Sequence, residues 1–256
     1  SRNSIIFQSE NRDSSKVTLV NNSNTSVSNY TVRLSGASGI TFRDLTISTS
    51  NTSYGRVFEL ILGASNISLN NNILESANIN STSTNHSIVY IYNGNHTNNS
   101  NNQFTGNVFI RGAFGLYNYG YRNNGVYDKN LLISGNTFDQ PYYTAVFLNY
   151  CDTVSIQGNT IRTGSYTNAF GIYMEYCRGN VNIQKNNIHI PAGYMGIYLY
   201  NQSATAAKRS LIANNMISVL GNGNNYGLYF YGSYLDFYNN NIHLNSSNTG
   251  SYGAYF

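Results

Sequence analysis

Short segments in which apolar and polar residues alternate follow one another along the whole chain, and two patterns recur among them. The first reads apolar, any, apolar, any, any, Asn, any, apolar, and its clearest copies begin at Val154, Val181 and Leu235. Alternation with a period of two is typical of β-strands, and no stretch has the period of a helix. An earlier copy has Leu45 where the others have Asn. The recurrent Asn falls at Asn72, Asn107, Asn136, Asn159, Asn186, Asn215 and Asn240.

The second pattern reads Gly, aliphatic, aromatic, apolar, and it interleaves with the first. Successive copies lie about 25 to 31 residues apart, so each repeat holds two or three short strands separated by Gly/Asn turns. One such unit cannot bury its own apolar face, but units stacked as coils form a continuous core. A sandwich of hairpins would not explain why one residue type recurs at the same place in every unit. The copies begin at Gly115, Ala145, Gly171, Gly196, Gly227 and Gly253, with an earlier one at Ile88.

These patterns predict an all-β fold, a parallel β-helix, in which every strand pairs with its equivalent in the next coil. We expect a single domain over residues 1–256, built from about eight to nine coils. The recurrent Asn should lie at a bend between strands, where Asn tolerates the left-handed backbone conformation. Stacked copies can pass amide hydrogen bonds along the axis. The sequence therefore predicts an asparagine ladder.

The repeats resemble those of right-handed parallel β-helices, the pectate-lyase-like superfold. Three segments further resemble β-helical regions of large secreted bacterial surface proteins: Tyr-Thr-Val-Arg-Leu-Ser-Gly-Ala at 30–37, Gly-Arg-Val-Phe-Glu-Leu at 55–60 and Gly-Ile-Tyr-Met-Glu-Tyr-Cys at 171–177. The resemblance covers essentially the whole chain and implies a right-handed coil at a cell surface or outside the cell. It implies no single activity, because lyases, hydrolases, adhesins and passive stalks share this superfold.

Alternation divides the second pattern between two faces. Ile172, Met174, Ile197 and Leu199 should point into the core, which sends the aromatic residue of each repeat outward. Two residues farther along each strand lies another outward position. We therefore expect a first file of Tyr90, Tyr117, Phe147, Tyr173, Tyr198, Tyr229 and Tyr255, and a second file of Tyr92, Tyr119, Asn149, Glu175, Tyr200 and Tyr231.

Three interpretations of these files stay open. They can form a platform for carbohydrate, because the apolar face of a sugar stacks on an aromatic plane and a phenol oxygen offers a hydrogen bond. They can instead stabilise the sheet as stacked cross-strand pairs, or pack against a neighbouring domain or subunit. The candidate glycan-binding residues are Tyr90, Tyr92, Tyr117, Tyr119, Tyr173, Glu175, Tyr198, Tyr200, Tyr229 and Tyr231.

The distribution of charged and apolar residues argues against nucleic acid and membranes as partners. The chain has 14 basic and 10 acidic residues, spread thinly and with no stripe that could follow a nucleic-acid backbone. No apolar run is long enough for membrane insertion. A second outward face, with Ser68, Asn70, Ser155, Gln157, Asn182 and Gln184, is expected to be a solvated polar wall.

Cys151 and Cys177 occupy equivalent places in neighbouring coils. Stacked equivalents lie within the distance that a disulfide accepts, so a bridge and two free thiols are both open alternatives. Asp152 and Arg178, which directly follow the two cysteines, are expected to form an exposed ion pair between coils.

The Asp, Glu and His residues give little support for an enzymatic activity. A pectate-type lyase needs clustered carboxylates for Ca²⁺ and a basic residue to take the proton, and a glycosidase needs two carboxylates around the scissile bond. Stacking brings few of the ten acids together. The four histidines are His86, His96, His189 and His243. They fall in predicted turns or at strand ends and are expected to be ordinary surface residues. We therefore expect no metal site and no cofactor.

We therefore expect a noncatalytic extracellular repeat module, a rigid stalk or an adhesin, with polysaccharide or cell-surface glycan as its partner. Because the chain begins Ser1-Arg2-Asn3 without Met, we also expect it to be a fragment of a longer precursor, with neighbouring domains as further partners. The alternative is a carbohydrate-active β-helix, a polysaccharide lyase or glycoside hydrolase. Its site would lie in the variable connections 75–87, 93–103 and 121–130.

Overall fold

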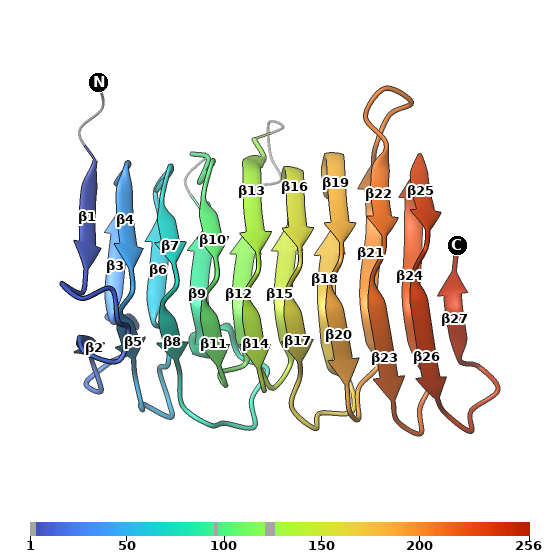
Figure 1. The fold of residues 1–256 in the computed structure, drawn as a ribbon, viewed down its shortest axis with the longest axis horizontal. Coiled ribbons are helices and arrows are strands. Elements are labelled where there is room, and N and C mark those ends of the chain that lie inside the picture. Colours follow the sequence, from blue (N-terminus) through green and yellow to red (C-terminus); the bar gives the residue numbers. More distant parts are fainter. Residues whose placement is uncertain (1–3, 95–96, 121–125) are drawn as a thin grey trace.

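Three rows of short parallel strands run along the molecule and enclose one core (Figure 1). A computed structural model describes residues 4–94, 97–120 and 126–256. Within each coil the chain passes through one strand of each row, and each strand pairs in parallel with its equivalents in the coils before and after it. The coils stand side by side, and the first strand, β1 (Ile5–Gln8), and the last, β27 (Tyr252–Tyr255), lie at opposite ends of the molecule. The predicted parallel β-helix is confirmed.

We call the row that carries the aromatic positions the tyrosine row. It consists of β3 (Val32–Ser35), β6 (Phe58–Ile61), β9 (Ser87–Tyr92), β12 (Phe114–Tyr119), β15 (Thr144–Asn149), β18 (Phe170–Glu175), β21 (Met195–Ser203), β24 (Tyr226–Ser233) and β27 (Tyr252–Tyr255).

The polar row carries the small uncharged outward residues. It consists of β1 (Ile5–Gln8), β4 (Ile40–Arg43), β7 (Ser68–Asn70), β10 (Gln103–Thr105), β13 (Asp128–Ser134), β16 (Cys151–Gln157), β19 (Arg178–Gln184), β22 (Ser210–Ala213) and β25 (Leu235–Tyr238). The polar row and the tyrosine row are joined into one 18-stranded sheet.

The short row follows the Asn bend and forms a separate 9-stranded sheet. It consists of β2 (Thr18–Val20), β5 (Thr46–Ser48), β8 (Ile73–Glu75), β11 (Val108–Ile110), β14 (Thr137–Asp139), β17 (Thr160–Arg162), β20 (Asn187–Ile190), β23 (Met216–Leu220) and β26 (Asn241–Asn245). The one helix among the described residues is the single-turn 3₁₀ helix η1 (Thr84–His86), in the connection from β8 to β9.

Inward side chains of the three rows stack in files of the same residue type. In the short row, Phe109 lies over Phe138 with ring centroids 4.5 Å apart, and the file continues through Ile161 and Ile188. All four side chains are at most 1 % exposed. Burying a large apolar side chain contributes roughly 1.5 to 3 kcal/mol, so these files hold neighbouring coils together.

The asparagine ladder is present at the bend between the polar row and the short row. Asn159 Oδ1 accepts hydrogen bonds from the N–H of Asn136 at 2.9 Å and from its Nδ2 at 3.0 Å. The Nδ2 of Asn159 donates in turn to Asn186 Oδ1 at 2.9 Å and to the carbonyl of Ile133 at 3.0 Å. Leu45 stands at the first ladder position and donates only its N–H, to Asn72 Oδ1 at 3.2 Å.

The left-handed residue of each bend is not the ladder Asn, as the sequence suggested, but the residue before it. Gly158 has a φ of 62°, and Lys185, Asn214 and Asp44 have φ values of 56°, 58° and 55°. The ladder Asn needs ordinary backbone geometry so that its side chain points inward, where its amide is buried. The positive φ that turns the chain therefore falls on the preceding residue, which is exposed at Gly158, Lys185 and Asn214 and buried at Asp44.

Candidate functional site

The first file lies on the outside of the tyrosine row, as its alternation predicts. Tyr117 pairs in register with Tyr90 on one side and with Phe147 on the other. The register continues from Phe147 through Tyr173 and Tyr198, and then through Tyr229 to Tyr255. Their side chains are half-buried, except for Tyr255, which is exposed. Ile172, Met174, Ile197 and Leu199, which alternate with them, are fully buried.

The rings of the first file stack on one another along the helix axis. Tyr117 lies 5.4 Å from Tyr90 and 4.8 Å from Phe147, centroid to centroid, with interplanar angles of 2° and 7°. Tyr229 is likewise stacked between Tyr198 at 5.2 Å and Tyr255 at 5.1 Å. Tyr173 and Tyr198 are tilted by 40° to each other, whereas the other neighbouring pairs are stacked. Because neighbouring rings cover the faces of the stacked rings, the file presents mainly ring edges and phenol hydroxyls to the solvent.

The second file is aromatic only at its two ends. Tyr92 lies over Tyr119 with centroids 6.2 Å apart, and Tyr200 over Tyr231 at 5.3 Å. Between these pairs the register brings Asn149 and then Glu175, of which Asn149 is buried. Glu175 turns toward the first file and accepts a hydrogen bond from the Tyr173 hydroxyl at 2.6 Å. The structure therefore brings the sequence-predicted residues together on one face, in two separate aromatic patches beside a continuous file.

Phenols in the middle of this face keep their protons at physiological pH. Burial raises the pKa of Tyr117 and of Tyr198 well above the usual value. Burial also raises the pKa of Tyr173, and the hydrogen bond to Glu175 adds to this effect. The hydroxyls thus remain neutral groups that can both donate and accept hydrogen bonds.

A third file of aromatic side chains, which we did not predict, packs beside the first file. Phe114 contacts Tyr143 edge to face at 5.4 Å, and Phe170 contacts Tyr173 edge to face at 4.9 Å. The sequence signal was available, because an aromatic residue directly precedes the repeat Gly in several copies. This third file consists of Phe114, Tyr143, Phe170, Tyr194, Tyr226 and Tyr252.

An ionic cluster closes the first file at its N-terminal side. The guanidinium of Arg56 lies over the ring of Tyr90, 3.4 Å from its centroid. Glu59, which is the register neighbour of Tyr90, is buried and binds Arg56 at 2.7 Å and also Arg33. This carboxylate is thus occupied by two cations.

Cys151 and Cys177 are both buried and have free thiols in the structure. They directly precede Asp152 and Arg178, which the register pairs. A hydrogen bond with the Cys177 thiol, and then burial, raise the pKa of Cys151 well above its usual value. Asp152 and Arg178 form the expected ion pair, at 3.0 Å.

Asp128, which stands at the start of β13, brings an unexpected carboxyl group into the core. It is 1 % exposed. Its Oδ1 accepts from the N–H of Asn99 at 2.7 Å, and its Oδ2 accepts from the amide of Asn118 at 3.1 Å. Burial raises the pKa of Asp128 to about 6, although these hydrogen bonds oppose the shift.

The histidine prediction was wrong for His86. This residue ends η1, is 5 % exposed, and its backbone carbonyl accepts a hydrogen bond from Ala113. Burial lowers its pKa. His189 and His243 lie within strands of the short row, half-buried and exposed, whereas His96 and part of the predicted connection 121–130 fall outside the described residues.

The predicted polar wall occupies the outward side of the polar row, where its side chains are half-buried and bond to one another, as Gln157 does to Ser155.

Over the described ranges no group of three or more His, Cys, Asp or Glu side chains could hold a metal ion. Over the same ranges, no helix is long and apolar enough to cross a bilayer.

Comparison with known proteins gives one match. Residues 125–256 match the model of a family described as "right handed beta helix region". No curated protein and no solved structure matches the chain. The family match spans just over half of the chain and agrees with the parallel coils observed on both sides of residue 125. The chain therefore belongs to the right-handed β-helix family.

Proposed function

We propose that this chain is a noncatalytic repeat module of a secreted or cell-surface protein, which acts as a rigid spacer and contacts glycans through its tyrosine row. The observation that carries the proposal is the unbroken register of the first file from Tyr90 to Tyr255. It supports a stiff rod, because neighbouring coils are joined by backbone pairing, ladder and ring stacking at once. It also supports a surface that repeats an aromatic ring in every coil from β9 to β27, with a phenol hydroxyl on each ring except that of Phe147.

The geometry of the rings favours contact through hydroxyls and ring edges. The ring faces inside the file are covered by their neighbours, so a sugar cannot stack on them as on an open platform. Except at Phe147, the phenol groups recur at the spacing of adjacent strands, about 4.8 Å, which is close to the length of one sugar unit in an extended chain. A glycan lying along the file could therefore hydrogen-bond to successive hydroxyls.

Chemistry of the surface supports an extracellular location. Charged residues make up only 9 % of the chain, and the outward side chains of the polar row are mostly amides and hydroxyls. Such a surface presents many hydrogen-bonding groups and little net charge to a glycan or to a neighbouring domain of the same precursor.

A glycan array tests the proposal. The change is Tyr173→Ala combined with Tyr198→Ala, which removes two adjacent hydroxyls from the middle of the file. We expect the variant to lose most of the glycan binding of the parent chain, whereas Tyr238→Ala, an exposed tyrosine on β25, should keep it.

Equal array signals for the parent chain and the double variant would contradict glycan contact through the file. Formation of an unsaturated product or of new reducing ends from a polysaccharide would instead establish the alternative, a carbohydrate-active enzyme.

A further inference from the structure

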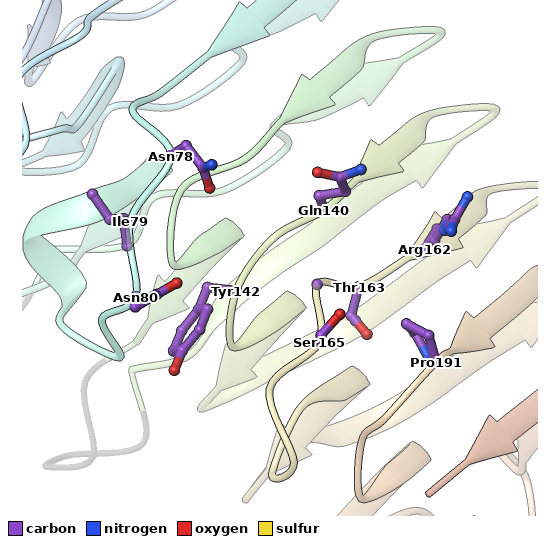
Figure 2. Close-up of a pocket in the computed structure, with 10 residues that line it drawn as sticks. Asn78, Ile79, Asn80, Gln140, Tyr142, Arg162, Thr163, Ser165 and Pro191 are labelled. Carbon is purple, nitrogen blue, oxygen red and sulfur yellow. The ribbon is translucent and has the colours of Figure 1, made fainter.

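A buried bend of the coil, where the tyrosine row turns into the polar row, brings together two thiols and a carboxyl group that belong to neither file. They are the side chains of Cys151, Cys177 and Asp128, and each residue is at most 1 % exposed. An open hollow of about 480 Å³ at the opposite bend has a different character (Figure 2). Among the described residues that line it there is no cysteine, histidine or carboxylate, and Tyr142 and Arg162 lie at its opposite ends.

Cys151 and Cys177 lie directly opposite each other in neighbouring coils, because the residues on both sides of them are in register. The residues before them, Tyr150 and Tyr176, stack with ring centroids 5.3 Å apart. The residues after them pair in the sheet and form the ion pair described above, at 3.0 Å. Opposite residues of adjacent strands have Cα atoms about 4.8 Å apart, which lies inside the range of about 4.4 to 6.8 Å that a disulfide spans.

The two thiols also contact each other. The hydrogen bond between them is the largest of the effects that raise the pKa of Cys151. The Cys151 sulfur accepts a further hydrogen bond from the Asn118 amide at 3.1 Å, and the same amide donates to Asp128 at 3.1 Å. The Asn118 amide therefore holds the Cys151 sulfur inside the bend, within hydrogen-bonding distance of Cys177.

We propose that Cys151 and Cys177 form a disulfide bond as the chain folds under oxidising conditions, and that this bond clips two neighbouring coils together. The oxidant is a small-molecule disulfide such as oxidised glutathione. The thiolate of one cysteine attacks a sulfur of this molecule and releases one glutathione thiol, and the thiolate of the other cysteine then displaces the second. Overall, the two cysteines lose two protons and two electrons, and one molecule of oxidised glutathione is reduced to two thiols.

Burial determines when this reaction takes place. In the folded chain both cysteines are 0 % exposed, and the raised pKa keeps the Cys151 thiol protonated. Thiol–disulfide exchange needs a thiolate that the oxidant can reach. The bond therefore forms before the two coils close over the sulfurs, and the folded chain then shields it from reductants.

A bond at this bend closes the whole coil between residues 151 and 177 into a loop. Such a loop restricts the unfolded chain, which raises the stability of the folded chain relative to it. An extracellular chain, as proposed above, meets the oxidising conditions that favour the bond. The reaction itself depends only on the two thiols, so the isolated chain reports on it whatever the result of the glycan array.

The test is refolding of the chain from urea, either in a mixture of reduced and oxidised glutathione or in a phosphine reductant. After oxidative refolding, the thiols that titrate in denaturant should fall from two per chain to none. A peptide map without reductant should give one linked pair of peptides that contains Cys151 and Cys177. The midpoint of urea unfolding should be about 1 M higher for the linked chain than for the reduced chain.

Cys151→Ala and Cys177→Ala each remove one partner, and each variant should have the same urea midpoint after both treatments. The peptide map needs only the parent chain, so it remains decisive if a variant fails to fold. The proposal is overturned if both thiols still titrate after oxidative refolding, if glutathione stays attached to the cysteines, or if links form only between chains. Equal midpoints for the linked and the reduced chain would overturn the clip.

Discussion

Asp128 shows how one residue can run against the pattern of its repeat. Its position in the register is occupied by Cys151 in the next coil, and the surrounding core is largely aliphatic. A carboxyl group is tolerated there because Asn93, Asn99 and Asn118 supply three hydrogen bonds. These bonds offset only part of the desolvation cost, which leaves the ionised form disfavoured.

The raised pKa of Asp128 makes stability depend on pH. Between its ordinary value of 3.8 and the folded value of about 6, the folded chain binds more protons than the unfolded chain. The free energy of unfolding therefore contains a contribution that is full below pH 3.8 and is lost as the pH rises to about 6, with a size on the order of 3 kcal/mol.

Asp128→Asn should remove this pH dependence. His86, whose pKa is lowered, acts in the opposite sense, because its buried neutral form is lost in acid. The quantity to measure is therefore the difference in the free energy of unfolding between the parent chain and the variant, from urea titrations at several pH values. We expect this difference to shift against the parent chain as the pH rises from 4 to 7. A constant difference would show that Asp128 titrates normally.

Individual strands of this protein are too short to be stable alone, so the elements depend on what repeats between them. The files of Phe, Ile and Leu join neighbouring coils along the core, and the Asn ladder adds side-chain hydrogen bonds between coils from Asn72 to Asn240. The Asn ladder ends at Leu45, because an aliphatic side chain can neither donate nor accept the hydrogen bonds that would extend the ladder to the preceding coil.

Removing one rung of the ladder tests this dependence. Asn159→Ala leaves the N–H of Asn136 and the carbonyl of Ile133 without their side-chain partner inside the protein. Leaving such buried groups unpaired should lower the free energy of unfolding by about 2 to 4 kcal/mol. The control is Asn187→Ala, at the exposed position that follows the ladder residue Asn186. It should change the free energy of unfolding by less than about 0.5 kcal/mol. Similar losses from both variants would show that the ladder amides stabilise little.

The sequence predicted the elements better than their contacts. Alternation and spacing were sufficient for the strands, the coils and the two files, since each depends on a residue type that recurs. The burial of His86 and Asp128 depends on connections that occur once, and no repeat reports on them. Ring orientation was equally inaccessible: the order Tyr90, Tyr117, Phe147 fixes that the rings are neighbours, but the coil spacing decides that they stack face to face.

The whole molecule is a rod whose length grows by one strand spacing per coil. Every structural and functional inference depends on this geometry, because only stacked coils turn one aromatic residue per repeat into a file. The outward positions of the short row offer convenient markers. Thr18, Thr137, Asn187 and Asn241 are all exposed and stand in one register file, which places them a known number of coils apart.

Spin-label distances from Thr18 test the stacking most directly. Cysteines for the labels replace Thr18 and, in turn, Thr137, Asn187 or Asn241, in a chain whose Cys151 and Cys177 are changed to alanine. The register puts these positions four, six and eight coils from Thr18. At about 4.8 Å per coil, pulsed electron resonance should give backbone separations of about 19, 29 and 38 Å, in a linear series. Distances that fail to rise in this order, as antiparallel hairpins would produce, would contradict the parallel coil and both proposals with it.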